Sequence, residues 1–293
     1  MFGTIDDENK LGDKLRASLP SDVHAGPEIG FAHRKASDGD AYFLVNTSNH
    51  PGTGQARFRI SRRDAEWWNP FTGKTSRVGG PRDTGLALNL APYESRVVVF
   101  SSQASKGRTR DAGLARAAKK SIDLSSDWTV TRSGVAEKKH EFHSWTGDPK
   151  WKQFSGQAMF EKAMTLKPSG RPTFLTFGEG IPVAVGSEKR AGSRMRAWLE
   201  SPVREAAVVF VNGKRAGGVW CPPYEVDITG LIRADENSIR IVVGNLAVNA
   251  MVGRLDDYSK LDVRYGERFQ AQDMEQIKPE PSGLLGPVRL VTR

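Results

Sequence analysis

The sequence predicts an all-β protein made of two β-sandwich domains, with one short helix near the N-terminus. Short segments alternate between apolar and polar residues at a period of two, which is typical of half-buried strands. Glycine, proline and asparagine separate these segments at frequent intervals, as expected for strands joined by turns. Strands do not alternate with helical segments, so the pattern favours neither a doubly wound α/β sheet nor an α/β barrel.

The predicted helix lies in residues 1–27, ahead of the first β domain. Lys10–Ser18, "KLGDKLRAS", places Leu11 and Leu15 four residues apart and therefore on one face of a helix. Pro20 and Pro27 follow, and proline lacks the backbone donor that a helix needs. We therefore expect a short helix and then a loop.

Residues 28–103 are expected to form a small sandwich of about six short strands. One strand begins at Asp40 in "DAYFLVNTS", and another begins at Arg57 in "RFRISRR". The second strand places Phe58 and Ile60 on one side because side chains alternate along an extended chain. The valine-rich segment "SRVVVFSS" is a further strand.

Residues 104–121 are expected to be a basic linker, because they hold few large apolar side chains and several lysines and arginines. Residues 122–293 then read as a larger jelly-roll-type sandwich. The dipeptide Asn212–Gly213 predicts a tight hairpin, since both residues tolerate positive φ. The later strand "NSIRIVV" points three side chains to one face, namely Ile239, Ile241 and Val243.

Charge and cysteine content limit the kinds of site to consider. The chain has 43 Lys and Arg against 34 Asp and Glu, a net charge of +9. These charges are scattered and no recognition helix is visible, so we expect a solvated surface and no nucleic-acid partner. Cys221 is the only cysteine, which excludes an intrachain disulfide and a cysteine-cluster metal site. No apolar run is long enough to span a membrane, and no signal peptide is visible.

Several motifs resemble one family. "SWTGDPKWKQFSGQAMFEK", "VNGKRAGGVWCPPYEVDITGLI", "ADENSIRIVVGNLAVN" and "PSGLLGPVRLV" resemble the C-terminal galactose-binding-like sandwich of α-L-rhamnosidase-type glycoside hydrolases. "EWWNPFTGK" and "LAPYESRVVVF" resemble the β domain that precedes it. The resemblance runs from Glu28 to the end of the chain. It implies that the second sandwich is a galactose-binding-like jelly roll.

The resemblance also implies a function. The catalytic acids of such enzymes lie in a barrel, which takes roughly 200 residues or more. We expect residues 1–27 to be the remnant of a preceding catalytic region, and the chain to be an accessory, non-catalytic region without the barrel. The implied partners are that barrel, on a parent or neighbouring polypeptide, and carbohydrate such as a rhamnose-containing glycan. Two alternatives remain, an independent lectin-like module and a free-standing glycosidase. The family implies a periplasmic or extracellular location.

The candidate carbohydrate-binding residues combine aromatic rings with polar groups, because sugar rings stack on aromatic faces while amides and charged groups bind hydroxyls. They are Trp151, Trp220, Tyr224, Asn249, Arg254 and Asp256. The alternative interpretation is that Trp220 fills the interior of the sandwich. Trp145 is expected in the core, and Trp151 is expected on the surface because lysines flank it.

Other chemistry finds weaker support. Trp67 and Trp68 lie on opposite faces of a strand, so one is expected in the core and the other at an interface. A glycosidase needs two converging carboxylates, and no spacing of acidic residues assembles such a pair. His140 and His143 in "KHEFHSW" have a ligand-like spacing but alternate in direction. We therefore expect no catalytic residues, no bound metal and no cofactor; a structural calcium stays open.

Overall fold

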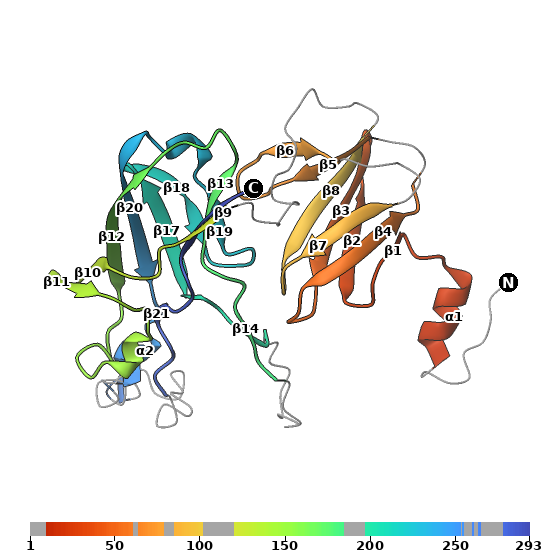
Figure 1. Ribbon diagram of the computed structural model, residues 1–293. Coiled ribbons are helices and arrows are strands. Elements are labelled where there is room, and N and C mark those ends of the chain that lie inside the picture. Colours follow the sequence, from red (N-terminus) through yellow and green to blue (C-terminus); the bar gives the residue numbers. More distant parts are fainter. Residues whose placement is uncertain are drawn as a thin grey trace. The chain divides into compact units, whose positions relative to one another are not determined.

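The computed structural model describes residues 10–60, 64–78, 85–101, 120–184, 197–252, 254, 260, 263–264 and 278–293. The predicted linker therefore lies almost entirely outside the described residues. The chain divides into two compact units, Met1–Leu114 and Ala115–Arg293. Every strand pair among the described residues is antiparallel, and the helices are short (Figure 1). The all-β class is confirmed.

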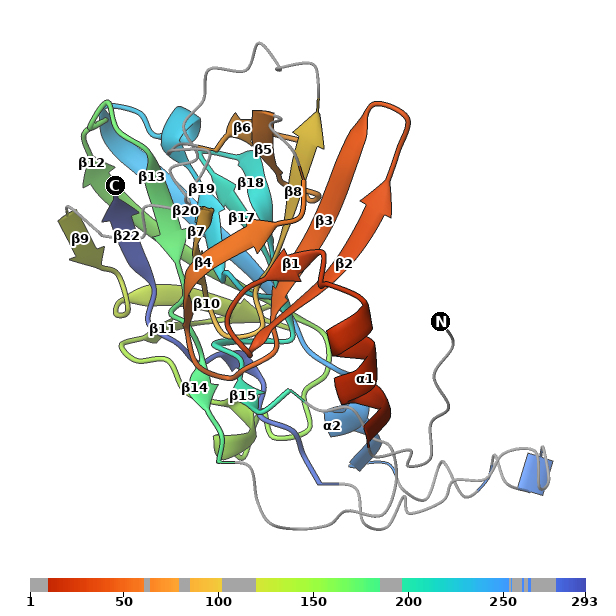
Figure 2. The same cartoon turned by 90° about the vertical axis from the view of Figure 1, so that its right-hand side faces the viewer.

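The first unit is a β-sandwich preceded by helix α1 (Leu11–Ser18), as predicted. Its strands are β1 (Val23–His24), β2 (Ile29–Lys35), β3 (Gly39–Asn46), β4 (Gly52–Phe58), β5 (Asp64–Trp68), β6 (Thr75–Arg77), β7 (Leu86–Leu90) and β8 (Ser95–Ser101). One sheet has the order β2-β3-β8-β5-β6 and the other β1-β4-β7. Both views show β2 and β3 as a hairpin (Figures 1 and 2).

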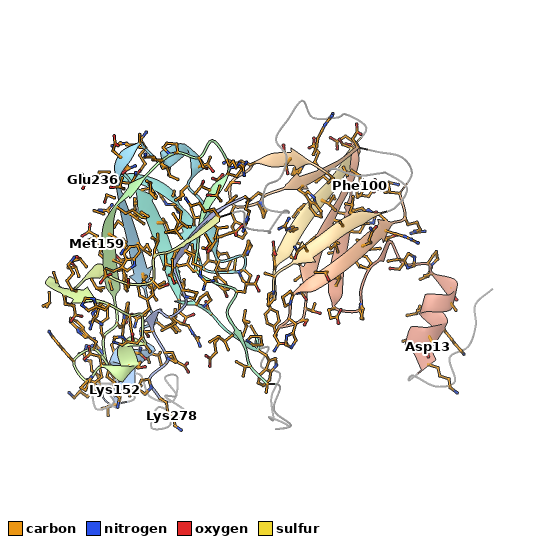
Figure 3. The ribbon with its side chains drawn as sticks, in the orientation of Figure 1. Asp13, Phe100, Lys152, Met159, Glu236 and Lys278 are labelled. Carbon is orange, nitrogen blue, oxygen red and sulfur yellow. The ribbon has the colours of Figure 1, made fainter. Side chains whose placement is uncertain are left out.

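Alternation along the strands builds the core of the first unit. Tyr42 pairs with Val98, and Val98 with Trp67, so these side chains form one buried row on the inner face of the larger sheet. Leu44 and Phe100 extend this row along β3 and β8; Phe100 is labelled in Figure 3. The core of this unit is therefore built from every second residue of neighbouring strands.

One strand boundary differs from the prediction. The strand expected to begin at Arg57 instead ends at Phe58 and starts at Gly52. Its ladder to β7 runs from Gly52 to residue 56, and glycines concealed that pairing in the sequence. Ile60 lies beyond the strand but packs against the core with Phe58, as the alternation predicted.

The second unit is a larger sandwich. Its strands are β9 (Lys120–Asp123), β10 (Trp128–Arg132), β11 (Val135–Lys139), β12 (Gln157–Leu166), β13 (Thr173–Thr176), β14 (Ile181–Pro182), β15 (Leu199–Glu200), β16 (Val203–Arg204), β17 (Ala206–Val211), β18 (Lys214–Val219), β19 (Glu225–Asp227), β20 (Asp235–Gly244), β21 (Gly283–Leu284) and β22 (Arg289–Thr292). The two main sheets have the orders β11-β10-β12-β20-β17-β18 and β19-β13-β22-β9. Helix α2 (Val248–Val252) follows β20.

Two predictions for this unit are confirmed in detail. Asn212 and Gly213 have φ of 52° and 79°, and they join β17 to β18 in a hairpin. On β20 the three apolar side chains Ile239, Ile241 and Val243 are fully buried. Burying each of them contributes about 2 kcal/mol to stability.

Candidate functional site

Most candidate residues lie near one end of the second sandwich, as the strand registers show. Gly244 pairs with both Gln157 and Ala206, so the end of β20 lies beside the starts of β12 and β17. Trp151 precedes β12, Asn249 follows β20, and Trp220 and Tyr224 lie in the connection between β18 and β19. Sequence segments that are far apart therefore bring their loops to the same end of the fold.

Asn249 is a structural residue. It is 1% exposed, and its amide group donates to the Glu280 carbonyl oxygen at 3.0 Å and to Ser282 Oγ at 2.6 Å. The backbone N–H of Glu280 donates to Asn249 Oδ1 at 2.7 Å. These bonds tie α2 to the segment that enters β21, so the side chain is not directed at a ligand.

Tyr224 is also buried. Its backbone carbonyl accepts a hydrogen bond from Phe177, and burial raises the pKa of its hydroxyl. The ring is therefore not available as a stacking surface for a sugar.

The expectation that Trp151 lies on the surface is wrong, since its exposed fraction is 6%. The N–H of Trp151 donates to Asp148 O and that of Phe154 donates to Trp151 O, so two consecutive turns direct the indole inward. The Arg132 guanidinium lies 4.1 Å from the ring centroid and Phe154 meets the ring edge-on. The flanking lysines gave the wrong signal because the chain is turned here and not extended.

Arg132 is a buried charged residue that was not among the predicted site residues. It is 2% exposed, forms a charge-assisted hydrogen bond with Glu137, and also lies 5.9 Å from the Trp145 ring. Burial alone would raise the pKa of Glu137, but the contacts with Arg132 outweigh it and hold that pKa low. The signal was present in "WTVTR", where Arg132 follows Trp128 and Val130 at inward positions.

A small pocket lies beside this arginine. It is lined by Val130, Arg132, Lys139, Glu141, His143, Trp145, Phe160 and Leu284. Its volume of about 10 Å³ matches a single water molecule and is far below the several hundred Å³ of a small-molecule site. Glu141 is the one carboxylate in its lining, whereas glycoside hydrolysis needs two. The pocket therefore does not have the size or the carboxylate pair of a glycosidase active site.

Trp220 is the candidate aromatic residue that is open to solvent. Its exposed fraction is 60%, so it does not fill the interior of the sandwich. The next residues are Cys221, which is half-buried, and the cis-linked pair Pro222–Pro223. Arg254 is exposed, and Asp256 lies outside the described residues. A complete set of sugar contacts therefore does not assemble from the predicted residues that the structure describes.

His140, one of the two histidines with ligand-like spacing, has a structural partner. His140 Nδ1 contacts Asp127 Oδ1 at 2.7 Å, and this hydrogen bond lowers the pKa of Asp127. The described part of the chain contains no group of three or more His, Cys, Asp or Glu side chains that could hold a metal ion.

Trp145 is 4% exposed and Trp67 is 3% exposed, as expected for core residues, whereas Trp68 is 47% exposed.

A second polar cluster lies in the first unit. His33 Nδ1 contacts Asp22 Oδ2 and His33 Nε2 contacts Asp40 Oδ1, each at 2.9 Å. The imidazole stacks on Tyr42 with centroids 4.2 Å apart, and Arg59 Nε donates to Asp22 at 3.0 Å. Both ring nitrogens are occupied, so this histidine is not placed to act on a substrate.

Comparison with known proteins identifies the relationship. Residues 9–80 match the family model described as alpha-L-rhamnosidase. The structure superimposes on a rhamnosidase from Novosphingobium sp. PP1Y over 97% of this chain, with a TM-score of 0.68 and 25% identity. The predicted resemblance to α-L-rhamnosidase-type enzymes is confirmed. The chain is thus rhamnosidase-like and related to glycoside hydrolases.

The relationship covers part of those proteins. This chain spans 26% of the Novosphingobium rhamnosidase. A putative beta-glucuronidase from Formosa agariphila is 29% identical over 104 residues, which make up 34% of this chain and 9% of that protein. Among the described residues, no helix is long and apolar enough to cross a membrane.

Proposed function

We propose that this chain is an accessory, non-catalytic β-sandwich region of an α-L-rhamnosidase-type glycoside hydrolase and that it supports the remainder of such an enzyme. The observation that carries the proposal is the superposition on the Novosphingobium rhamnosidase, which takes in nearly all of this chain and about a quarter of that one. The alpha-L-rhamnosidase family model matches residues of the first unit, consistent with the same role.

The chemistry of the described residues supports a role without catalysis. Hydrolysis of a glycosidic bond by a retaining or inverting route uses a pair of carboxylates on either side of the scissile bond. The water-sized pocket beside Arg132 has one carboxylate in its lining, and the nearby Glu137 is engaged by Arg132. Neither arrangement can both protonate a leaving group and activate a nucleophile.

The proposal predicts that the purified chain does not hydrolyse glycosides. An aryl α-L-rhamnoside incubated with the chain should release no phenol above the blank. The matched control is the Novosphingobium rhamnosidase under the same conditions, which establishes that the substrate and buffer report activity. Enzyme-dependent release by the chain alone would contradict the accessory role.

Exposed Trp220 favours a second function, contact with carbohydrate. A 60% exposed indole beside a proline pair offers a face on which the C–H side of a sugar ring could stack. Because Tyr224, Asn249 and Trp151 are buried, Trp220 would act with few predicted partners, and we expect weak binding.

This contact can be measured by titrating the full chain with rhamnose-containing oligosaccharides and following backbone amide shifts. Trp220→Ala should abolish the shifts, while Trp68→Ala, which removes the 47% exposed tryptophan of the other unit, should leave them unchanged. Shifts that persist in Trp220→Ala would exclude this residue as the contact.

A further inference from the structure

Three arginines that the structure describes in the second unit lie over aromatic rings, and two of them also bind a carboxylate. The Arg293 guanidinium lies 4.4 Å from the Phe174 ring centroid, and its two terminal nitrogens donate to Glu225 at 3.0 and 2.5 Å. Arg132 likewise combines a contact with an indole ring and an ion pair with Glu137. In both cases a ring supports the face of the guanidinium and a carboxylate binds its N–H groups.

Arg240 is the third of these arginines, and the second unit supplies no carboxylate for it. Its guanidinium lies 4.4 Å from the Phe210 ring centroid. Its Nε atom is buried without a hydrogen-bond partner, and within the described part of the chain its side chain forms no hydrogen bond or ion pair. Its terminal nitrogens are not buried. The ring therefore orients a set of N–H donors whose acceptor lies outside this unit.

The acidic residue beside Arg240 on the sheet does not act as its partner. Glu161 on β12 is paired in register with Arg240 on β20, and both lie on the face opposite the core, because their neighbours Phe160 and Ile241 are buried. Opposite charges in such positions attract each other, yet no ion pair joins these two described side chains. Arg240 instead lies over Phe210, its partner on β17. The face therefore presents a donor and an acceptor side by side.

An apolar row lies next to these two groups on the same face. Met159 on β12 pairs with Val242 on β20, and Val242 pairs with Val208 on β17. These strands are neighbours in the sheet, and Met159 is labelled in Figure 3 (Figures 1 and 3). The row is two residues from Arg240 along the strands, roughly 7 Å away. A hydrogen-bonding pair and an apolar surface thus lie within reach of one sugar ring.

We propose that Glu161, Arg240 and this apolar row bind a hexuronic acid unit of a glycan, a sugar that carries a carboxylate. The carboxylate of the sugar binds Arg240 as Glu137 and Glu225 bind the other two arginines. Its hydroxyls donate to Glu161, and its C–H face packs on the apolar row. This site is separate from the Trp220 contact and does not depend on the accessory role.

The charges on this face select a sugar acid over other occupants. An inorganic anion or an acidic side chain of a protein could bind Arg240, but Glu161 would repel it and would gain no donor. The hydroxyls of a sugar acid supply that donor. Arg215, the exposed partner of Phe210 on β18, adds a second positive charge to this row, so an anionic sugar is favoured over a neutral one.

The test titrates the full chain with trigalacturonate and with its methyl ester at one low ionic strength and follows backbone amide shifts. The ester retains the hydroxyls and the C–H faces but carries no charge, so the comparison isolates the carboxylate. We expect trigalacturonate to shift amides of β12, β17 and β20, and the ester to bind at least about tenfold more weakly. Absence of trigalacturonate binding, equal binding of the two ligands, or shifts confined to other strands would overturn the proposal.

Substitutions of Arg240 test the location. Arg240→Met retains an aliphatic chain against Phe210 and should weaken trigalacturonate binding at least about tenfold. Arg240→Lys retains the charge but not the planar fork, and should weaken binding at least about threefold. The controls are Arg171→Met, at an exposed arginine before β13, and Trp220→Ala; both should leave the Kd unchanged. Melting curves establish which variants fold, and Arg240→Lys decides if Arg240→Met does not.

Two further observations separate this occupant from the others. Glu161→Ala should weaken trigalacturonate binding at least about threefold, because it removes the acceptor for the hydroxyls. Tighter binding would show that Arg240 takes a simple anion. Amide shifts of the first unit caused by Arg240→Met without ligand would show that an acidic side chain of that unit occupies the arginine. Either of these results, or an unchanged Kd in both Arg240 variants, overturns the sugar-acid site and leaves the accessory role and the Trp220 contact standing.

Discussion

The neighbours of His33 favour its charged form and raise its pKa. A neutral imidazole has one N–H donor, so it can donate to both Asp22 and Asp40 only when it is protonated. Burial alone would lower the pKa of His33, but the hydrogen bonds that its ring donates to the two carboxylates outweigh burial, so the pKa is raised. The pKa of Asp22 is lowered by its hydrogen bond with Arg59, which has the larger effect, and by its hydrogen bond with His33. The cluster therefore links the loop before β1 to β2 and β3 through charge.

The cluster predicts how the stability of the first unit depends on pH. A raised folded pKa means that the contribution of His33 is complete below its ordinary value of 6.5 and is lost as pH rises through the folded pKa. The contribution of Asp22 is lost as pH falls below its ordinary value of 3.8 and through its lowered pKa. The cluster therefore stabilises the unit most between about pH 4 and 6.5.

Melting curves across this range test the prediction. His33→Gln should lose about 1 kcal/mol near pH 5.5, and the difference from the wild type should shrink above neutrality. His24→Gln, at an exposed position of β1, is the control and should follow the wild type at every pH. A deficit in His33→Gln that stays constant with pH would show that stacking on Tyr42, and not charge, accounts for the effect.

Removing Glu137 should destabilise the second unit more than removing Arg132, although the two side chains form one ion pair. Glu137→Ala leaves a buried guanidinium without its closest anion and should reduce the free energy of unfolding by about 2 kcal/mol. Arg132→Met leaves Glu137, which is partly open to water, and retains a flexible side chain against Trp151, so it should cost less than about 1 kcal/mol. Urea unfolding measures both values. The reverse order would show that the arginine acts mainly by packing.

Residue-level prediction succeeded where the chain is extended and failed where it turns. Trp67 and Trp145 are buried as expected, and Trp67 and Trp68 lie on opposite faces of β5 because side chains alternate along a strand. The prediction for Trp151 was wrong because the burial of a residue in a turn depends on distant partners, here Arg132 on β10. No local pattern contains that information.

Among the elements, the β17–β18 hairpin is the one that the sequence specifies most directly. Gly213 has φ of 79° and open space around the position of a Cβ atom, so a substitution there meets backbone strain and no clash. Gly213→Ala should cost about 1 kcal/mol in unfolding free energy. Gly230→Ala is the matched control, since that glycine also has open space but does not have positive φ, and it should be close to neutral. Equal effects of the two substitutions would refute the role of φ.

Helix α1 illustrates the opposite case. Its existence follows from the spacing of Leu11 and Leu15, yet the reason for its stability does not, because the leucines are exposed in the described structure. The predicted start of strand β4 was wrong because it, too, depends on contacts that the local sequence does not contain. Its start at Gly52 depends on pairing with β7, more than thirty positions away, and glycines carry no local strand signal.

For the molecule as a whole, alternation and turn residues were enough to predict the all-β class, since each strand buries every second side chain. The order of strands in each sheet was not predictable, because neighbours such as β12 and β20 are far apart in the sequence. The named candidate residues stay a prediction as a binding site. Four of these residues come from loops that meet at one end of the second sandwich, but three of the four, Trp151, Tyr224 and Asn249, are buried there.

The measurement that most directly tests the central claim, that this chain supports glycoside hydrolysis without performing it, is a long progress curve with the purified chain at high concentration. The account predicts that an aryl α-L-rhamnoside yields product at the blank rate, whatever the concentration of the chain. Product formation that rises in proportion to the chain, and follows it through a final sizing column, would contradict the account.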